Sequence, residues 1–194
     1  IMQLCRARER VLRDHDIGAP FQHIKDRENV SSIDLYNEVV HDLHTMSIEE
    51  KWFSLIEGVF AGNLFDLGSP ATMHTAHEAP DFFDAIENVH QRPWAVDDYD
   101  RLAADLPHNP PPKWTRAVVF VDNAGSDFIL GVMPLVRELA LAGVQIVLAA
   151  NELPSLNDIT ADETITVTVP PTTMGGRALD VTPTLDLISA GAHP

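Results

Sequence analysis

Two short apolar runs joined by one helical pattern constrain the fold of this chain more than any other feature. Residues 117–121 and 144–150 consist almost entirely of Val, Ile, Leu, Ala and Phe, as expected for strands buried on both faces of a parallel sheet. Between them, apolar side chains recur at helical spacing over residues 128–139, and Gly143 follows as a stop signal. Pro134 lies inside this pattern and predicts a bend or a break in the helix. We therefore predict a β-α-β crossover in this part of the chain.

The sequence divides into three regions around this crossover. Amphipathic patterns predict a helical subdomain over residues 1–105, and four prolines within residues 106–116 predict a stiff connector. Residues 117–194 are expected to form an α/β domain. The predicted fold class is α/β, with a parallel three-layer α/β/α (Rossmann-like) core that is incomplete and is preceded by the α-helical subdomain.

Two local patterns predict further elements. Ser47, with Glu50 three positions later, has the capping-box spacing that opens a helix. Residues 164–169 alternate between threonine and branched apolar side chains, which predicts an exposed strand.

Composition restricts the class of partner. The chain carries 13 basic and 29 acidic side chains, a formal charge of −16. Because this charge repels nucleic acids, no nucleic-acid partner is expected. A phosphorylated metabolite would need a metal or a basic group to invert the field locally. Cys5 is the single cysteine, so a disulfide framework is excluded and a reducing, cytoplasmic location is expected. No apolar run approaches the roughly 20 residues that span a bilayer, so no membrane partner is expected; the oligomeric state stays open.

Polar side chains follow both predicted strands. Asp122 and Asn123 come directly after the first strand, whereas Asn151 and Asp158 follow the second. Because the carboxyl ends of parallel strands meet at one edge of a sheet, these side chains are expected to converge. Carboxylate and amide oxygens suit Mg²⁺ or Mn²⁺, so the sequence indicates a metal site there.

The start of the following helix offers a place for a phosphate. The backbone N–H groups of Gly125 and Ser126 are expected to be free to bind one. Asp127 lies in the first turn, where it would favour the helix dipole or orient a water. A cation with a phosphate beside it is the minimum arrangement for metal-assisted hydrolysis, with a metal-activated water as the nucleophile.

Each feature also has a purely structural interpretation. Asp122 and Asn123 could cap the following helix, and residues 157–158 could form a plain turn. The polar residues within 62–66 interrupt an apolar helix end, as a C-cap would. The nine histidines, including the pair at 41 and 44, have no third ligand at zinc spacing and are expected to be solvated.

Several segments together resemble one known family, the metal-dependent damage-control phosphatases. The resemblance is greatest to the branch that comprises plant stand-alone enzymes and the carboxyl-terminal domain of the pantothenate kinase 4 type. The segments that carry it are residues 61–68 (Ala-Gly-Asn-Leu-Phe-Asp-Leu-Gly), 92–94 (Arg-Pro-Trp), 120–127 (Phe-Val-Asp-Asn-Ala-Gly-Ser-Asp), 129–131 (Ile-Leu-Gly), 134–139 (Pro-Leu-Val-Arg-Glu-Leu) and 148–160 (Leu-Ala-Ala-Asn-Glu-Leu-Pro-Ser-Leu-Asn-Asp-Ile-Thr).

The resemblance implies a fold, an activity and a set of residues. The implied fold is an α/β/α sandwich with an added helical domain. The implied activity is hydrolysis of phosphate monoesters of small metabolites, such as 4′-phosphopantetheine or related damaged or sugar phosphates, with Mn²⁺ or Ni²⁺ and alternatively Co²⁺ or Mg²⁺. The family's metal-binding and catalytic positions fall on Asp122, Asn123 and Asp158. Positions that line the same pocket and contact substrate fall on Asn63, Asp66, Asp127 and Asn151.

The chain also departs from the family pattern. The family continues after residue 160 with a Glu-Gly-Met-Gly-Arg motif near the phosphate, which is missing here, and residues 174–177 do not replace it. The 117–194 metal-binding domain is therefore expected to be truncated, to bind metal weakly and to turn over little substrate. One alternative is an inactive remnant that acts as a metal-binding or protein-interaction domain. A methyltransferase is a weaker alternative, because the glycine-rich first loop is absent.

Overall fold

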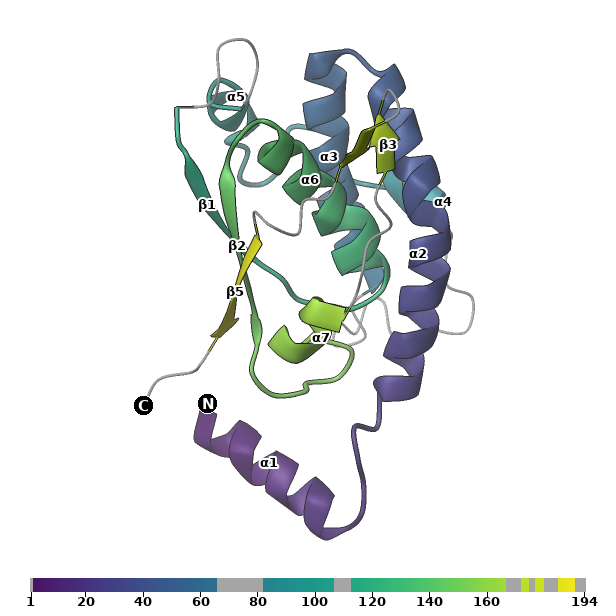
Figure 1. Cartoon of the computed structure of the whole chain (residues 1–194), viewed down its shortest axis with the longest axis vertical. Helices are drawn as coiled ribbons and strands as arrows, with labels where there is room; N and C mark the ends of the chain where they lie inside the picture. The colour runs from purple at the N-terminus through teal and green to yellow at the C-terminus, as the bar shows by residue number, and fades with distance from the viewer. Residues whose placement is uncertain are drawn as a thin grey trace.

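The computed structural model describes residues 2–65, 82–106, 113–166, 172–174, 177–179 and 185–190 (Figure 1). Its helices are α1 (Met2–Asp14), α2 (Gln22–Thr45), α3 (Ile48–Gly62), α4 (Phe82–Glu87), α5 (Tyr99–Ala103), α6 (Met133–Leu141) and α7 (Ala161–Thr166), with a 3₁₀ turn η1 (Asn63–Phe65) and a π-helix η2 (Ser126–Val132). Among the described helices, none combines the length and the apolarity that a membrane crossing requires.

The described strands form one parallel sheet and one small hairpin. Strands β1 (Arg116–Phe120), β2 (Gln145–Asn151) and β5 (Leu185–Ala190) pair in the order β1-β2-β5, all parallel. Strands β3 (Thr172–Met174) and β4 (Arg177–Leu179) pair antiparallel. The predicted α/β class and the β-α-β crossover are confirmed, whereas the third layer of a Rossmann-like core stays a prediction.

The two faces of the sheet differ. On one face, Ala117 and Val119 of β1 pack against the main apolar core, to which Ile146 of β2 belongs. On the other face, Val118 is 58% exposed and Phe120 is 77% exposed. The prediction that the first strand is buried on both faces is therefore wrong. The physical reason is position: β1 is the edge strand of the described sheet, whereas β2 lies between two neighbours and is buried on both faces.

The helical connection from β1 to β2 breaks next to Pro134, as predicted. Residues Ser126–Val132 form the π-helix η2, and α6 begins immediately afterwards with Pro134 in its first turn. A proline is tolerated there because the first N–H groups of a helix have no partner within the helix. Gly143 follows α6 with a φ of +88°, a backbone conformation that favours glycine, and returns the chain to β2.

A single apolar core joins the helices to the sheet. Tyr36 of α2, Leu55 of α3 and Ile129 of η2 belong to the same buried cluster as Ile146 of β2. The backbones of α3 and η2 come so close that a Cβ at Gly131 would lie 2.9 Å from the carbonyl oxygen of Gly58. The predicted boundaries at residues 105 and 117 stay a prediction, because residues 107–112 of the connector lie outside the described residues.

Capping explains one correct and one wrong prediction. The Ser47 side chain accepts from the Glu50 N–H at 3.3 Å, and Glu50 accepts from the Ser47 N–H at 3.0 Å, which confirms the predicted capping box of α3. The strand predicted from residue 164 is wrong for residues 164–166, which belong to α7. Thr160 and Glu163 repeat the same reciprocal contacts at the start of that helix, and this local signal overrides the alternation. Residues 167–169 lie outside the described part.

One histidine lies in an ionic network instead of in solvent. His44, near the end of α2, has its Nε2 atom 3.1 Å from Nη1 of Arg137 on α6. Arg137 contacts the adjacent Glu138, whose other oxygen lies 2.6 Å from Nζ of Lys51 on α3. The expectation of a solvated side chain is wrong for His44, because α6 partly covers it.

Candidate active site at the strand ends

Hydrogen bonds tie the end of β1 to the segment after β2. The Val121 N–H donates to Ala149 O at 2.9 Å, which continues the pairing of the two strands. The Ile159 N–H donates to Asp122 O at 2.7 Å, and Asn123 forms an antiparallel bridge with Asp158. These contacts bring Asp122, Asn123 and Asp158 to one edge of the sheet. That these three residues bind a cation stays a prediction.

Asn123 is the most constrained of the predicted ligands. It is 0% exposed, and both its backbone N–H and its side-chain amide donate to Oδ2 of Asp127, at 3.1 and 3.0 Å. Since the NH₂ group must face this carboxylate, the orientation of the amide is fixed. Its Oδ1 atom is buried and accepts no hydrogen bond within the described residues. An unmet buried acceptor costs about 1–3 kcal/mol, so this oxygen is suited to a ligand.

The two predicted carboxylate ligands lie in different surroundings. Oδ2 of Asp158, which is partly buried, accepts from Nδ2 of Asn151 at 2.6 Å. Asp122 is exposed, and its backbone carbonyl, not its side chain, makes the contact with Ile159. Within the described residues, no three His, Cys, Asp or Glu side chains gather in one group, so an amide oxygen is needed to complete a ligand set.

The structure bears on both structural interpretations. The residue at the N-cap position of η2 is Gly125, not Asp122 or Asn123, and no side-chain hydrogen bond is formed from that position. A turn is present before Asp158, whose N–H donates to Ser155 O at 2.8 Å. The same segment also pairs with the end of β1, because Asn157 O accepts from the Ala124 N–H at 2.9 Å.

The expected phosphate contact at the helix start is wrong for one of its two residues. The Gly125 N–H is not free, because it donates to Oδ1 of Asn29 on α2 at 2.8 Å. Gly125 has a φ of +72°, and a Cβ there would lie 2.7 Å from Cβ of Glu28. Burial raises the pKa of Glu28, against a lowering by Arg27, so this carboxyl holds a proton more readily than usual.

One face of α2 contributes side chains to this edge that the sequence patterns did not identify. Lys25 contacts Asp158 O, Asn29 contacts Gly125, and Oγ of Ser32 lies 3.3 Å from Oγ of Ser126. Their spacing of four and three residues continues the buried apolar stripe that runs through Tyr36 to the end of the helix. Polar residues in line with an apolar stripe are a signal of a buried polar contact, and that signal was available in the sequence.

The end of α3 closes the edge from another side. A Cβ at Gly62 would lie 2.7 Å from Cα of Asp127, and Nδ2 of Asn157 donates to Phe65 O at 3.2 Å. Asn63 is exposed and is the C-cap of α3, as its structural interpretation predicts. Asp66 lies outside the described residues.

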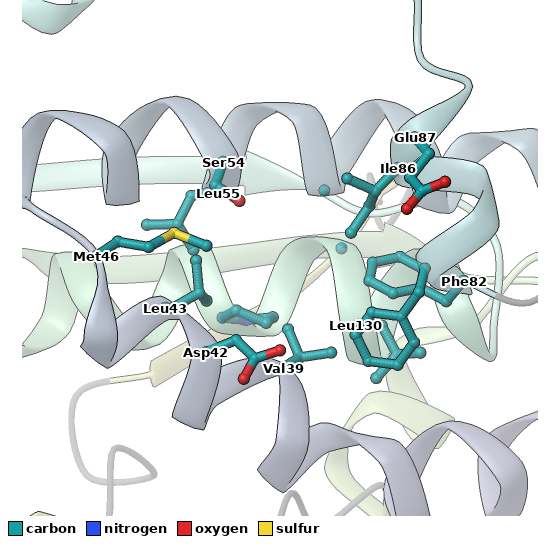
Figure 2. Close-up of a pocket in the computed structure, with 14 residues that line it drawn as sticks. Val39, Asp42, Leu43, Met46, Ser54, Leu55, Phe82, Ile86, Glu87 and Leu130 are labelled. Atoms are coloured by element: carbon teal, nitrogen blue, oxygen red, sulfur yellow. The ribbon is translucent and has the colours of Figure 1, made fainter.

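A pocket lies elsewhere, between α2, α3, α4 and the η2–α6 segment (Figure 2). Its volume is about 210 Å³, and most of its wall is apolar. Asp42 and Glu87 line it as well, and two carboxylates disfavour an anionic substrate. The pocket is lined by none of the predicted ligands, so the strand ends are the better candidate for phosphate chemistry. Its apolar wall includes Val39, Leu43, Leu55, Phe82, Ile86 and Leu130.

One known protein family matches most of the chain. Residues 1–170 match the model of the damage-control phosphatase ARMT1-like domain. The chain belongs to this family. Membership confirms the resemblance inferred from the motifs, and it gives the methyltransferase alternative no support.

Three known proteins are similar to most of this chain. The chain is 43% identical over 162 residues to damage-control phosphatase At2g17340 of Arabidopsis thaliana, covering 82% of this chain and 43% of that protein. It is 39% identical over 168 residues to pantothenate kinase 2 of Arabidopsis thaliana, covering 84% and 19%. It is 36% identical over 169 residues to 4′-phosphopantetheine phosphatase of Mus musculus, covering 86% and 20%. The chain thus spans less than half the length of these relatives.

Proposed function

We propose that this chain forms the metal-binding part of a phosphatase that hydrolyses phosphate monoesters of small metabolites. Asp122, Asn123 and Asp158 would hold the cation, with Mn²⁺ or Ni²⁺ preferred and Co²⁺ or Mg²⁺ as alternatives. The observation that carries the proposal is the buried Oδ1 atom of Asn123, an acceptor without a hydrogen-bond donor in the described part of the chain. A hard cation is the partner that an amide oxygen beside carboxylates suits best.

The surrounding side chains fit this proposal because they orient the donors. Asp127 turns the Asn123 amide so that its carbonyl oxygen is left for a ligand. Asn151 donates to Oδ2 of Asp158 and so fixes the orientation of this carboxylate. When bound, the cation supplies Lewis-acid chemistry to the phosphoryl group and to a water molecule. Its positive charge also offsets the chain's acidic excess, which would otherwise repel a phosphate.

The names of the relatives support a proposal for the substrate class. One of them is named a 4′-phosphopantetheine phosphatase, and two others are a damage-control phosphatase and a pantothenate kinase. We propose 4′-phosphopantetheine or a related damaged or sugar phosphate as the ligand. The whole-chain activity is a proposal too, because the chain covers 43% of its plant relative At2g17340.

The test removes the exposed carboxylate at the end of β1. Asp122→Ala should reduce Mn²⁺-supported hydrolysis of p-nitrophenyl phosphate to the background rate, because one ligand is lost. The fold should persist, since Asp122 is exposed and its backbone carbonyl, which accepts from Ile159, is kept in the variant. Asp34→Ala, an exposed aspartate on α2, is the matched control and should keep the parental rate. A parental rate in Asp122→Ala would show that the metal site is assigned to the wrong residues.

A metal-binding remnant without turnover is the second candidate. The matched region corresponds to 43% of At2g17340 and 20% of the mouse 4′-phosphopantetheine phosphatase, so the names of those whole proteins do not by themselves establish turnover here. Calorimetry with Mn²⁺ separates the two candidates. Metal binding without hydrolysis supports the remnant, whereas measurable turnover excludes it.

A further inference from the structure

A buried lysine connects α2 to the segment that carries Asp158. Lys25 is 1% exposed, and its Nζ atom lies 3.3 Å from Asp158 O and 2.5 Å from Oε1 of Glu163. The second oxygen of Glu163 accepts from the backbone and side chain of Thr160, at 2.8 and 2.9 Å. Burying an ammonium is costly unless it is paired. Lys25 is paired with groups at both ends of residues 158–163, the Asp158 carbonyl and the Glu163 carboxylate.

A second contact from the same helix holds the other ligand-bearing segment. Asn29 lies one helical turn after Lys25, and its Oδ1 atom accepts from the Gly125 N–H at 2.8 Å. Gly125 follows Asn123 by two residues. One rigid helix face therefore holds both segments that contribute proposed ligands, and the spacing of Lys25 and Asn29 limits how far those segments can move apart.

We infer that Lys25 is a positioning residue that sets the distance between the Asn123 and Asp158 ligands. It acts through the Asp158 backbone and through Glu163, not by contact with substrate. The inference rests on the proposed function, because it assumes that these ligands bind a cation. Cation affinity depends steeply on ligand placement, and loss of a supporting hydrogen bond typically weakens it by about 10–100-fold.

The test compares two lysines that each pair with a glutamate. Lys25→Met should raise the Kd for Mn²⁺, measured by calorimetry, by about tenfold or more. Lys51→Met is the matched control, since Lys51 lies on α3 and pairs with Glu138 at 2.6 Å in the ionic network. It should keep the parental Kd. Thermal unfolding with and without Mn²⁺ gives a second readout, in which only Lys25→Met should lose the metal-dependent rise in Tm.

A double variant separates positioning from stability. Lys25→Met leaves the Glu163 carboxylate without its cation, which itself destabilises the fold. Lys25→Met/Glu163→Gln removes that charge and should regain thermal stability, yet its Mn²⁺ affinity should remain low, because the contact with Asp158 O is still missing. If the double variant regains both, Lys25 has only a structural role and the inference is overturned.

The remaining outcomes distinguish this inference from the function on which it rests. If the parental chain binds Mn²⁺ and Lys25→Met binds it with the same Kd, the positioning role alone is wrong. If the parental chain binds no Mn²⁺, the metal site and the positioning role are both overturned.

Discussion

Two polar networks are buried along α2, one near each end, and they are built differently. The network near the end of α2 consists of side chains that pair with one another: Arg137 with His44 and Glu138, and Lys51 with Glu138. The network near its start contains one side-chain pair, Lys25 with Glu163, and also binds backbone groups, because Asn29 accepts from the Gly125 N–H and Lys25 donates to a carbonyl. It also includes the unmet acceptor of Asn123.

This difference separates stability from ligand binding. Side chains that pair with one another hold helices together, and the buried Nη2 atom of Arg137 in this network is a cationic donor that cannot bind a metal ion. Side chains that bind backbone groups fix the conformation of loops. They can hold an unmet acceptor such as Oδ1 of Asn123 in a fixed position, where a cation can bind it. Changes in the first network should therefore alter only the free energy of unfolding, whereas changes in the second should also alter metal affinity.

The largest expected loss of stability is at Glu138. Glu138→Ala removes the shared partner of Lys51 and of Arg137, which is 2% exposed. An uncompensated buried charge typically costs about 3–5 kcal/mol, and urea unfolding would measure that loss. The Kd of the folded fraction for Mn²⁺ should stay at the parental value. A clear change in that Kd would break the distinction between the two networks.

A smaller loss of stability but a larger loss of metal binding is expected at Asp127. Asp127→Ala removes two buried hydrogen bonds to Asn123 and should lower the free energy of unfolding by about 2–3 kcal/mol. The Asn123 amide is then free to rotate, so Mn²⁺ affinity should fall as well, by about tenfold or more. Calorimetry at a temperature where both proteins are folded separates the two effects. Unchanged affinity would mean that Asp127 does not orient a metal ligand.

The two glycines at the ends of the η2–α6 unit provide a matched pair. Gly125 and Gly143 both have positive φ, at +72° and +88°, so alanine is strained at either position. A Cβ at Gly125 would collide with Glu28, whereas a Cβ at Gly143 would have no neighbour within 4 Å. Gly125→Ala should cost about 2–3 kcal/mol and Gly143→Ala about 1 kcal/mol in urea unfolding. Equal costs would indicate that α2 does not pack tightly on the strand ends.

Local patterns in the sequence predict the elements whose cause is local. The crossover, the break at Pro134 and the capping box of Ser47 each depend on a few neighbouring residues, and the structure has all three. The exposure of Phe120 depends on which strand lies at the sheet edge, and an apolar run does not encode that. The capping-box spacing of Thr160 and Glu163 is a local signal for the helix at 161–166, and it outweighs the alternation that predicts a strand from residue 164.

The candidate site was predictable for a different reason. The convergence of Asp122, Asn123 and Asp158 follows from the geometry of parallel strands. The sequence motifs indicate the family independently of that geometry. The contribution of Lys25 and Asn29 is harder to predict, because it depends on how a distant helix docks. The hydrogen bonds of Lys25 span more than 130 positions of sequence, so the spacing along α2 indicates that Lys25 is buried but not which segment it contacts.

The smallest expected effect is a difference between the two networks in the pH range over which each loses stability. Burial lowers the pKa of His44, and the charge of Arg137 lowers it further, against an opposing effect of Glu138. The Nη1 donor of Arg137 also requires an unprotonated Nε2 on His44, which favours the neutral ring. Glu163, in the other network, has a lowered pKa as well: burial raises it, but hydrogen bonds from Lys25 and Thr160 lower it more.

The direction in which stability changes with pH depends on which state of the chain binds the proton more readily. Below its ordinary pKa of 6.5, the unfolded chain protonates His44 more readily than the folded chain does, so stability falls as pH drops from about 6.5 through the lower folded pKa. His44→Gln should lose this slope, while the loss linked to Glu163 should persist in both proteins below its ordinary pKa of 4.5. Urea unfolding between pH 7.5 and pH 3.5 would measure both. If His44→Gln keeps the parental slope just below pH 6.5, the ionic network does not hold this ring neutral, and its pairing with Arg137 has to be reconsidered.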